Sequence, residues 1–379
     1  MAEPVSPPTN TPNHAAIAAA LTRAGIAQPT LVIDRAALAA NIAEARRALA
    51  PTALALRIVT KSLQTPGLLQ AVMDSCATDR LMVFNGVMLE AILAAHPASD
   101  VLTGRPLPAA QVEAFVRRRK ADPAPAAHPQ WLVDSPDRLA QYAAIARGHG
   151  APMRLNLEID VGLRRGGLIG PAAVAELIDL AAAEPLLTIT GLMGYDAQVP
   201  AMPSPGDEMA KVRRRYAAAR TVLLDKLGAD PTGLTLNTAG SPTYSLHLDD
   251  EVANEVSIGS AFVKPLNFDL PTLAAHVPAC FVAMPVLKVL DGETSDQRRV
   301  FLYGGCGDAE PVWPAAVAFS PVGGGRYMLT APADLGLRQD DFVLLRPRES
   351  EGAFLQFGDI AVFDAGEIVD WWPTFPVAA

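Results

Sequence analysis

The sequence predicts an α/β fold, a (β/α)8 barrel over residues 28–270 followed by an antiparallel β domain over residues 271–379. From residue 30 to about residue 263, short β-rich runs alternate with Ala- and Leu-rich helical stretches, which indicates βα units and a parallel sheet. About eight such units in about 235 residues is the size of a closed barrel. After residue 270 the runs are β-patterned, with turns between them and no long helix.

The expected helices include residues 35–49 and 136–150, and the second begins at Pro136 and ends on Gly150, as helix capping predicts. A doubly wound parallel sheet is the alternative fold. It calls for a Gly-rich fingerprint after the first strand, and LVIDRAAL has none. The expected strands of the parallel sheet are LVID (31–34), ALALRIVT (53–60), RLMVFN (80–85), DVLTG (100–104), QWLVD (130–134), RLNLEID (154–160), LTITGLMGYD (187–196), LTLNT (234–238) and EVSIGSAFV (255–263).

Both ends of the chain carry their own expectations. Residues 1–27 read as a Pro-, Thr- and Asn-rich tail and a helix that packs with the β domain, without the features of a signal peptide. The C-terminal strands are expected at VAMPVLKVL (282–290), RRVFLYGG (298–305), RYMLTA (326–331), DFVLLRP (341–347) and IAVFDAGEIVDWW (360–372).

Composition excludes several classes of function. The net charge of −9 argues against a nucleic-acid partner, and the short RRRK segment (117–120) reads as a solvated helix end. No apolar run approaches the length of a membrane span. Cys76, Cys280 and Cys306 form neither a disulfide framework nor a CxxC metal site, so we expect a reduced, cytoplasmic setting.

A lysine and two loops of small residues follow expected barrel strands. Lys61 ends the segment LRIVTK, NTAGSPT spans residues 237–243, and Gly259-Ser260 follows on the next strand. The carboxyl ends of barrel strands gather at one face, so we expect these residues to meet. Small residues let backbone N–H groups point at a phosphate, although such a stretch can also be only a turn.

Together, Lys61 and the loops predict a site for pyridoxal phosphate. A partly buried amine beside cationic neighbours has a lowered pKa and becomes a nucleophile towards aldehydes. Pyridoxal phosphate needs such an amine at one end of its ring and an anion pocket at the other. Taken alone, Lys61 reads instead as a strand-end lysine that extends to solvent.

The order of these segments resembles the pyridoxal-phosphate enzymes of the alanine racemase barrel class, and most of all the branch of D-threonine aldolases and D-serine dehydratases. The resemblance implies a Schiff base on Lys61, a donor to the phenolic oxygen of the cofactor at Arg165, and Tyr195 beside the cofactor. We expect Arg57, Asn237, Thr238, Gly240, Ser241, Gly259 and Ser260 to complete the cofactor site. The matching segments are PTLVIDRAALAANI (29–42), LRIVTKS (56–62), LEIDVGLRRGG (157–167), GLMGYDA (191–197), TAGSPT (238–243) and EVSIGS (255–260).

The chain departs from that family in its histidines. Where relatives often have H-A-K and Y-H-G, this sequence has Val59-Thr60-Lys61 and Tyr195-Asp196-Ala197. No histidine follows His276, so the metal pair of the relatives is missing from the β domain. Glu349 and Glu351 would share one face of a strand and could hold Mg²⁺ or Mn²⁺. The alternative is a solvated strand end with Arg346 and Arg348 in salt bridges.

The resemblance implies a homodimeric enzyme acting on small amino acids, and we expect a lyase that cleaves or dehydrates β-hydroxy-D-amino acids. A racemase of the same fold is the alternative, with Tyr303 or Tyr327 as a second base. A non-catalytic carrier of the cofactor is disfavoured by the C-terminal domain. GGCGD (304–308) reads as a glycine turn, with Cys306 and Asp308 as candidates to line the active site across the dimer interface.

Overall fold

The computed structural model describes residues 12–119, 129–228, 230–304, 308–315, 317–320 and 327–375. It divides into two compact units, which are described separately. The barrel unit comprises Arg46–Lys61, Met73–Gly259 and Phe375–Ala379, and the sheet unit comprises Met1–Ala45, Ser62–Val72 and Ser260–Thr374. No helix among the described residues is both long and apolar enough to cross a membrane.

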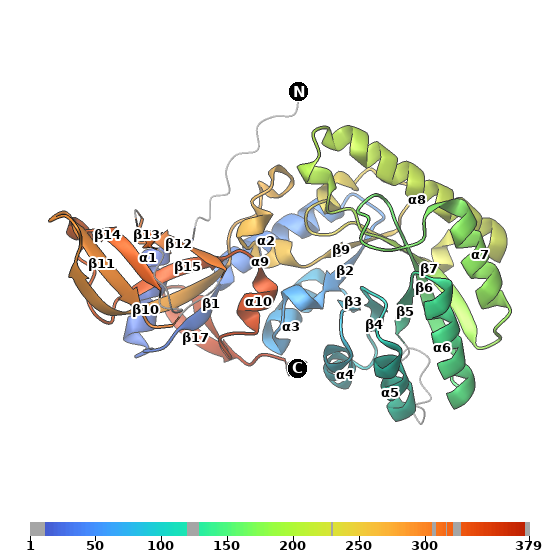
Figure 1. Cartoon of the computed structure of the whole chain (residues 1–379), viewed down its shortest axis with the longest axis horizontal. Helices are drawn as coiled ribbons and strands as arrows, with labels where there is room; N and C mark the ends of the chain where they lie inside the picture. Colours follow the sequence, from blue (N-terminus) through green and yellow to red (C-terminus); the bar gives the residue numbers. More distant parts are fainter. Residues whose placement is uncertain are drawn as a thin grey trace. The chain divides into compact units, whose positions relative to one another are not determined.

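Eight parallel strands, β2 to β9, close into a barrel (Figure 1). The closure is made where β2 pairs with β9, for example Arg57 with Ser257, while β2 also pairs with β3 on its other side. This confirms the predicted barrel and excludes the doubly wound sheet. The strands are β2 (Ala55–Val59), β3 (Arg80–Val83), β4 (Asp100–Thr103), β5 (Gln130–Val133), β6 (Met153–Ile159), β7 (Leu187–Gly194), β8 (Thr235–Thr238) and β9 (Glu255–Ile258).

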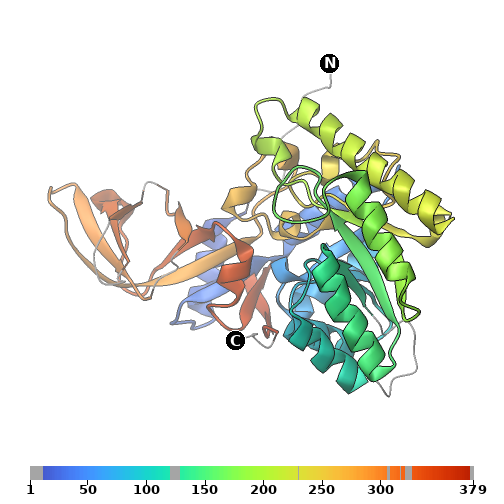
Figure 2. The ribbon, with the colours of Figure 1, turned by 45° about the vertical axis from the view of Figure 1, so that its right-hand side comes forward.

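Helices cover the outside of the barrel strands, and Figure 2 shows the green α6 and α7 lying side by side there. Local chemistry sets their ends: the Asn85 side chain caps α4, Pro136 opens α6, and Gly150 closes α6 with a positive φ of 61°. These helices are α4 (Gly86–Ala95), α5 (Ala109–Arg119), α6 (Pro136–His149), α7 (Gly170–Ala182) and α8 (Pro205–Leu227). Two others, α2 (Arg35–Leu49) and α3 (Pro66–Cys76), contain residues of both units.

Inside the barrel a polar layer and an apolar layer follow one another. The polar layer is built around Arg57 and Glu255, whose side chains are both fully buried and form an ion pair of 2.5 Å. Because Glu255, Asp100, Gln130 and Thr235 each open a strand, this layer lies towards the amino ends of the strands. The apolar layer consists of Met82, Leu102, Leu132 and Met193, with Val59 and Phe84 packed against it.

The sheet unit contains one nine-stranded sheet, mostly antiparallel. The N-terminal helix α1 (His14–Arg23) packs against it through Ile17 and Leu21. The strands are β1 (Thr30–Asp34), β10 (Cys280–Asp291), β11 (Gln297–Leu302), β12 (Ala309–Trp313), β13 (Ala318–Ser320), β14 (Met328–Pro332), β15 (Phe342–Pro347), β16 (Ile360–Asp364) and β17 (Glu367–Trp372). Short helices α9 (Ser260–Val263) and α10 (Ser350–Phe354) belong to the same unit.

Strand β1 is where the structure departs from the expected element order. The sequence predicts LVID (31–34) in the parallel sheet of the barrel, but β1 pairs antiparallel with β10 and parallel with β16. In Figure 1 it is the blue strand beside the orange β10. All five of its residues are buried, so its apolar pattern fits either sheet, and only the long-range pairing decides between them.

Candidate active site

The residues just after the carboxyl ends of the barrel strands form one polar face, called the carboxyl rim below. Lys61 lies there, in the 3-10 helix Thr60–Ser62 that follows β2, and its side chain is partly buried. Its Nζ atom is 4.7 Å from the centroid of the Phe84 ring, which follows β3. The aromatic face stabilises the ammonium and gives the lysine a defined position.

Arg165 and Tyr195 meet on the same rim, although they come from different strands. Arg165 follows β6 and Tyr195 follows β7, and the guanidinium Cζ lies 4.7 Å from the centroid of the tyrosine ring. Arg165 also donates a hydrogen bond of 3.2 Å to Glu158, at the end of β6. Burial raises the pKa of Glu158, while the charge of Arg165 opposes this rise. The structure thus brings Arg165 and Tyr195 into contact, and their roles towards the cofactor stay predictions.

The small-residue loop after β8 packs directly against that tyrosine. A Cβ atom at Gly240 would lie 2.3 Å from Cε2 of Tyr195, so only glycine allows the present position of the ring. Ala239, the residue before it, has a positive φ of 63°, as a tight turn after a strand requires. The loop and the ring thus fix each other's positions.

The two loops predicted to bind phosphate are joined by a hydrogen bond. The backbone N–H of Gly259 donates to Oγ of Ser241 at 3.0 Å, so that N–H is already used within the protein. The hydroxyl oxygen of Thr238 is buried and has no hydrogen-bond partner among the described residues. Ser260 opens α9, and its hydroxyl shares a hydrogen bond of 2.9 Å with Ser62 of the same unit.

This end of the barrel fits the predicted cofactor. A buried hydroxyl without a hydrogen-bond partner costs free energy, and a phosphate oxygen would give the Thr238 hydroxyl such a partner. The amine of Lys61 and the guanidinium of Arg165 supply positive charge on the same rim. The donor set of amine, guanidinium and hydroxyls suits an anionic, aromatic aldehyde.

A buried chain of charged side chains supports the small-residue loop after β8. The sequence did not predict this chain of charges. Asp196 is fully buried; it accepts a hydrogen bond of 2.5 Å from Thr243 of the loop and lies 2.7 Å from Nε2 of His247. Nδ1 of His247 lies 2.8 Å from Asp250. With a carboxylate on each ring nitrogen, the imidazole donates from both and carries a positive charge.

The pKa of His247 follows from these neighbours. Burial lowers this pKa, but the hydrogen bonds and charges of Asp196 and Asp250 outweigh burial and raise the value to about 9. The histidine hydrogen bond in turn lowers the pKa of Asp250, although burial opposes that change. One signal in the sequence pointed to this cluster, since Asp196 stands where relatives of the resembled family often have histidine.

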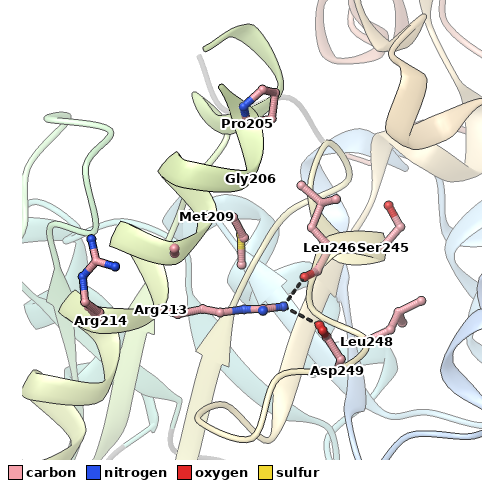
Figure 3. Close-up of a pocket in the computed structure, with 10 residues that line it drawn as sticks. Pro205, Gly206, Met209, Arg213, Arg214, Ser245, Leu246, Leu248 and Asp249 are labelled. Carbon is pink, nitrogen blue, oxygen red and sulfur yellow. Dashed lines mark hydrogen bonds and ion pairs between the residues drawn. The ribbon is translucent and has the colours of Figure 1, made fainter. Parts of the chain in front are cut away.

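Arg213 fastens the segment that carries His247 to helix α8. Its Nη2 donates to the carbonyl oxygen of Leu246 at 2.7 Å and to the carboxylate of Asp249. Figure 3 shows this side chain reaching from α8 across a surface pocket towards Leu246 and Asp249. The segment after the loop is thus held from outside by Arg213 and from inside by Asp196.

Two residues predicted to contact the cofactor have other roles. Arg57 uses all five of its N–H donors on Glu255, Asp100 and the carbonyl oxygen of Leu81. Asn237 donates to Glu255 and Ser257 at 2.8 and 2.9 Å. Both side chains therefore belong to the polar layer inside the barrel. Their inward-facing strand positions place them among buried carboxylates, which accept hydrogen bonds from both side chains, and a role as cofactor ligands stays a prediction.

The carboxylates proposed for a metal also lie differently from the prediction. Strand β15 ends at Pro347, and Glu349 and Glu351 lie at the start of helix α10 instead of on one face of a strand. Glu349 accepts a hydrogen bond of 3.0 Å from Asn267. Within the described ranges, no group of three or more His, Cys, Asp and Glu side chains is arranged to hold a metal ion.

The arginines expected to neutralise these carboxylates have other partners. Arg346 pairs with Asp269 at 2.7 Å, and Arg348 pairs with Glu310 and, at 3.4 Å, with Asp308. Asp308 is thus engaged within the sheet unit, and Cys306 lies outside the described residues.

The chain is similar in sequence to two curated proteins. It is similar to 3-hydroxy-D-aspartate aldolase of Paracoccus denitrificans (strain Pd 1222), with 31% identity over 131 residues, which are 34% of this chain and 33% of that protein. A second aldolase of that name from Paracoccus denitrificans is 27% identical over 128 residues. The alignments span about a third of the length of these curated relatives.

Solved structures extend the likeness to nearly the whole chain. D-threonine aldolase from Filomicrobium marinum has a TM-score of 0.76 at 19% identity, with 92% of this chain and 95% of that chain covered. D-threo-3-hydroxyaspartate dehydratase from Delftia sp. HT23 has a TM-score of 0.76 at 16% identity, with 92% and 97% covered. Alanine racemase from Bacillus anthracis has a TM-score of 0.67 at 14% identity, with 91% and 97% covered. At these identities the likeness shows the fold.

The family is shown by a match over most of the barrel. Residues 33–265 match the family model described as alanine racemase, N-terminal domain. That range includes Lys61, Arg165, Tyr195 and the loop from Thr238 to Thr243. The chain belongs to the alanine racemase N-terminal domain family.

Proposed function

We propose that this protein is a pyridoxal-phosphate-dependent lyase that acts on β-hydroxy-D-amino acids. The observation that carries the proposal is that Lys61, the Arg165–Tyr195 pair and the hydroxyl-bearing loop all follow the carboxyl ends of barrel strands. The family supports pyridoxal phosphate as the cofactor. The names of the relatives, aldolases of D-threonine and 3-hydroxy-D-aspartate and a hydroxyaspartate dehydratase, support the lyase.

In this proposal Lys61 holds the cofactor covalently, and the hydroxyls of Thr238 and Ser241 donate to its phosphate. Tyr195 lies beside the ring, and Arg165 donates to the phenolic oxygen. When bound, pyridoxal phosphate supplies an electron sink for charge that develops at the Cα atom of an amino acid. Gly259 and Ser260 remain predicted phosphate contacts.

The protein residues would then handle protons and orientation. The amine of Lys61 would take a proton from the substrate on its own face. Arg165 would be oriented by Glu158, and Tyr195 by its contact with Gly240. The buried Asp196–His247 pair holds the loop in place, so its hydroxyls need no rearrangement to meet the phosphate.

Two other functions use the same rim. A racemase needs a second base on the opposite face of the substrate, and Tyr303 and Tyr327 of the sheet unit stay candidates for it. A non-catalytic carrier would need only the lysine and the phosphate loop. A homodimer, a cytoplasmic location and Mg²⁺ or Mn²⁺ at Glu349 and Glu351 stay predictions.

The test is to follow the fate of substrate atoms in deuterated water. D-threonine, D-serine, D-threo-3-hydroxyaspartate and both enantiomers of alanine are incubated with the reconstituted protein and observed by proton NMR. The lyase yields glycine with an aldehyde, or a keto acid with ammonia, from the β-hydroxy-D-amino acids only. Exchange of the Cα proton of alanine with inversion, and no carbonyl product, would establish the racemase instead. The carrier would give neither exchange nor product.

A further inference from the structure

Arg105 is a cation of the carboxyl rim that the proposed cofactor contacts leave out. It follows β4 after Gly104, and its side chain is exposed. Its guanidinium Cζ lies 5.3 Å from the centroid of the Phe84 ring, and Nζ of Lys61 lies 4.7 Å from the same centroid. The two cationic groups are therefore at most about 10 Å apart.

The ring that both cations share is firmly seated. Phe84 packs against the apolar layer inside the barrel. A Cβ atom at Gly104 would lie 2.3 Å from Cζ of Phe84, so the backbone before Arg105 closes directly on the ring. Lys61 and Arg105 are thus placed around one rigid aromatic side chain, which gives them a defined spacing.

Three acidic groups that follow barrel strands are already engaged elsewhere. Asp134 accepts a hydrogen bond from Ser135 at 3.2 Å, and Asp160 accepts from the backbone N–H groups of Gly162 and Arg164. Asp196 is taken by His247 and Thr243. Across the part of the chain that the structure describes, Arg105 makes no ion pair or hydrogen bond. Its guanidinium therefore keeps its donors available for a ligand that carries negative charge.

We propose that Arg105 binds the side-chain carboxylate of the substrate and selects acidic β-hydroxy-D-amino acids of four carbons, such as 3-hydroxy-D-aspartate. The inference rests on the proposed function, because it takes Lys61 as the point where the substrate is joined to the cofactor. In such an amino acid the side-chain carboxylate lies about 4 Å from the amine nitrogen. A charge-assisted hydrogen bond adds about 2.8 Å, so the span needed stays within the upper limit of about 10 Å between the two cations.

Arginine is suited to this choice, since its planar fork binds a carboxylate through two parallel hydrogen bonds. A neutral substrate such as D-threonine leaves the guanidinium in water and gains nothing from it. Selection would therefore come from added affinity for the acidic substrate, with little change for the neutral one.

The test measures binding by calorimetry to the reconstituted protein with D-aspartate and D-alanine. Neither ligand has a β-hydroxyl group, so binding is read independently of lyase activity. The wild type should bind D-aspartate more tightly than D-alanine. Arg105→Gln should lower the affinity for D-aspartate at least tenfold and change the affinity for D-alanine less than twofold. Arg105→Lys should lose part of the preference for D-aspartate.

Arg138→Gln is the matched control, because Arg138 also lies over an aromatic ring, with its Cζ 5.7 Å from the centroid of Tyr142, but on helix α6. It should leave both affinities unchanged. If Arg105→Gln lowers the affinity for both ligands equally, Arg105 binds the α-carboxylate, and the proposed selection of acidic substrates is overturned. Unchanged affinities, or a wild type without preference, would overturn the proposal as well. A retained preference without any lyase product would count against the lyase alone.

Discussion

The guanidinium of Arg165 lies over the ring of Tyr195, with its Cζ 4.7 Å from the ring centroid, and the ring in turn presses on Gly240. One residue of the loop after β6, one after β7 and one after β8 are thus stacked in sequence. The stack joins the predicted ring contact of the cofactor to its predicted phosphate loop. A substitution at one of the three residues should therefore shift the positions of the other two.

Replacement of Arg165 tests its role at the cofactor. We expect Arg165→Gln to weaken cofactor affinity at least tenfold but to lower the free energy of unfolding by only about 1 kcal/mol, because its ion pair with Glu158 is partly exposed on the arginine side. Cofactor titration and urea unfolding measure the two effects. Arg164→Gln is the control, since Arg164 is exposed and precedes Arg165. Equal cofactor affinity in both variants would contradict the assignment.

A methyl group at Gly240 tests the contact with Tyr195. Gly240→Ala places a carbon 2.3 Å from Cε2 of the tyrosine, so the ring or the loop has to move. Cofactor affinity should fall about tenfold or more, by at least 1.4 kcal/mol. Gly233→Ala, where a Cβ atom meets open space, should leave it unchanged. If both variants bind the cofactor like the wild type, the loop is a turn without a role in binding.

The charge of His247 predicts a pH dependence of stability. Its folded pKa of about 9 exceeds the ordinary value of 6.5, so its contribution is fully present below about pH 6.5 and is lost as the pH rises through about 9. The contribution is on the order of 3 kcal/mol. Asp196, Asp250 and Arg213 are the charged groups around it. Urea unfolding should show that the stability difference between wild type and His247→Asn shrinks between pH 6.5 and pH 9.5. A difference that does not change with pH would rule out a charged His247.

Chelation tests whether Glu349 and Glu351 hold a hard metal ion. If they do, a chelator abolishes lyase activity, and Mg²⁺ or Mn²⁺ restores it better than Zn²⁺. Because both carboxylates lie at the start of α10 and Glu349 already accepts from Asn267, we expect the chelator to leave activity within twofold of its starting value. Activity that is lost with chelator and regained with Mn²⁺ would contradict this expectation and restore the original metal prediction.

Several features of the barrel and its rim could be read from the sequence for a simple physical reason. Alternating β and helical runs produce a parallel barrel, and the carboxyl ends of its strands share one face. Residues in the segments that follow strands, such as Lys61, Arg165 and Tyr195, are therefore expected on that face. The hydrogen bond between Ser241 and Gly259 follows from the same rule, because β8 and β9 are neighbours.

Features that depend on distant partners could not be read in this way. Arg57 lies within a strand, and only the fold brings Glu255 to it from 198 residues away. His247 lies in a loop without periodicity. In the sequence, its partner Asp196 only marks the absence of a histidine that relatives often have, and the contact between the two residues depends on the fold. The sheet membership of β1 likewise depends on its pairing with β10 and β16.

The most direct test of the proposed cofactor site is to find the residue that carries the cofactor. The protein is reconstituted with pyridoxal phosphate, reduced with borohydride, digested and mapped by mass spectrometry. We predict a phosphopyridoxyl group on Lys61, and its loss in a Lys61→Gln variant that keeps the circular dichroism of the wild type. A label on another lysine, or no label after reconstitution, would contradict the proposed site.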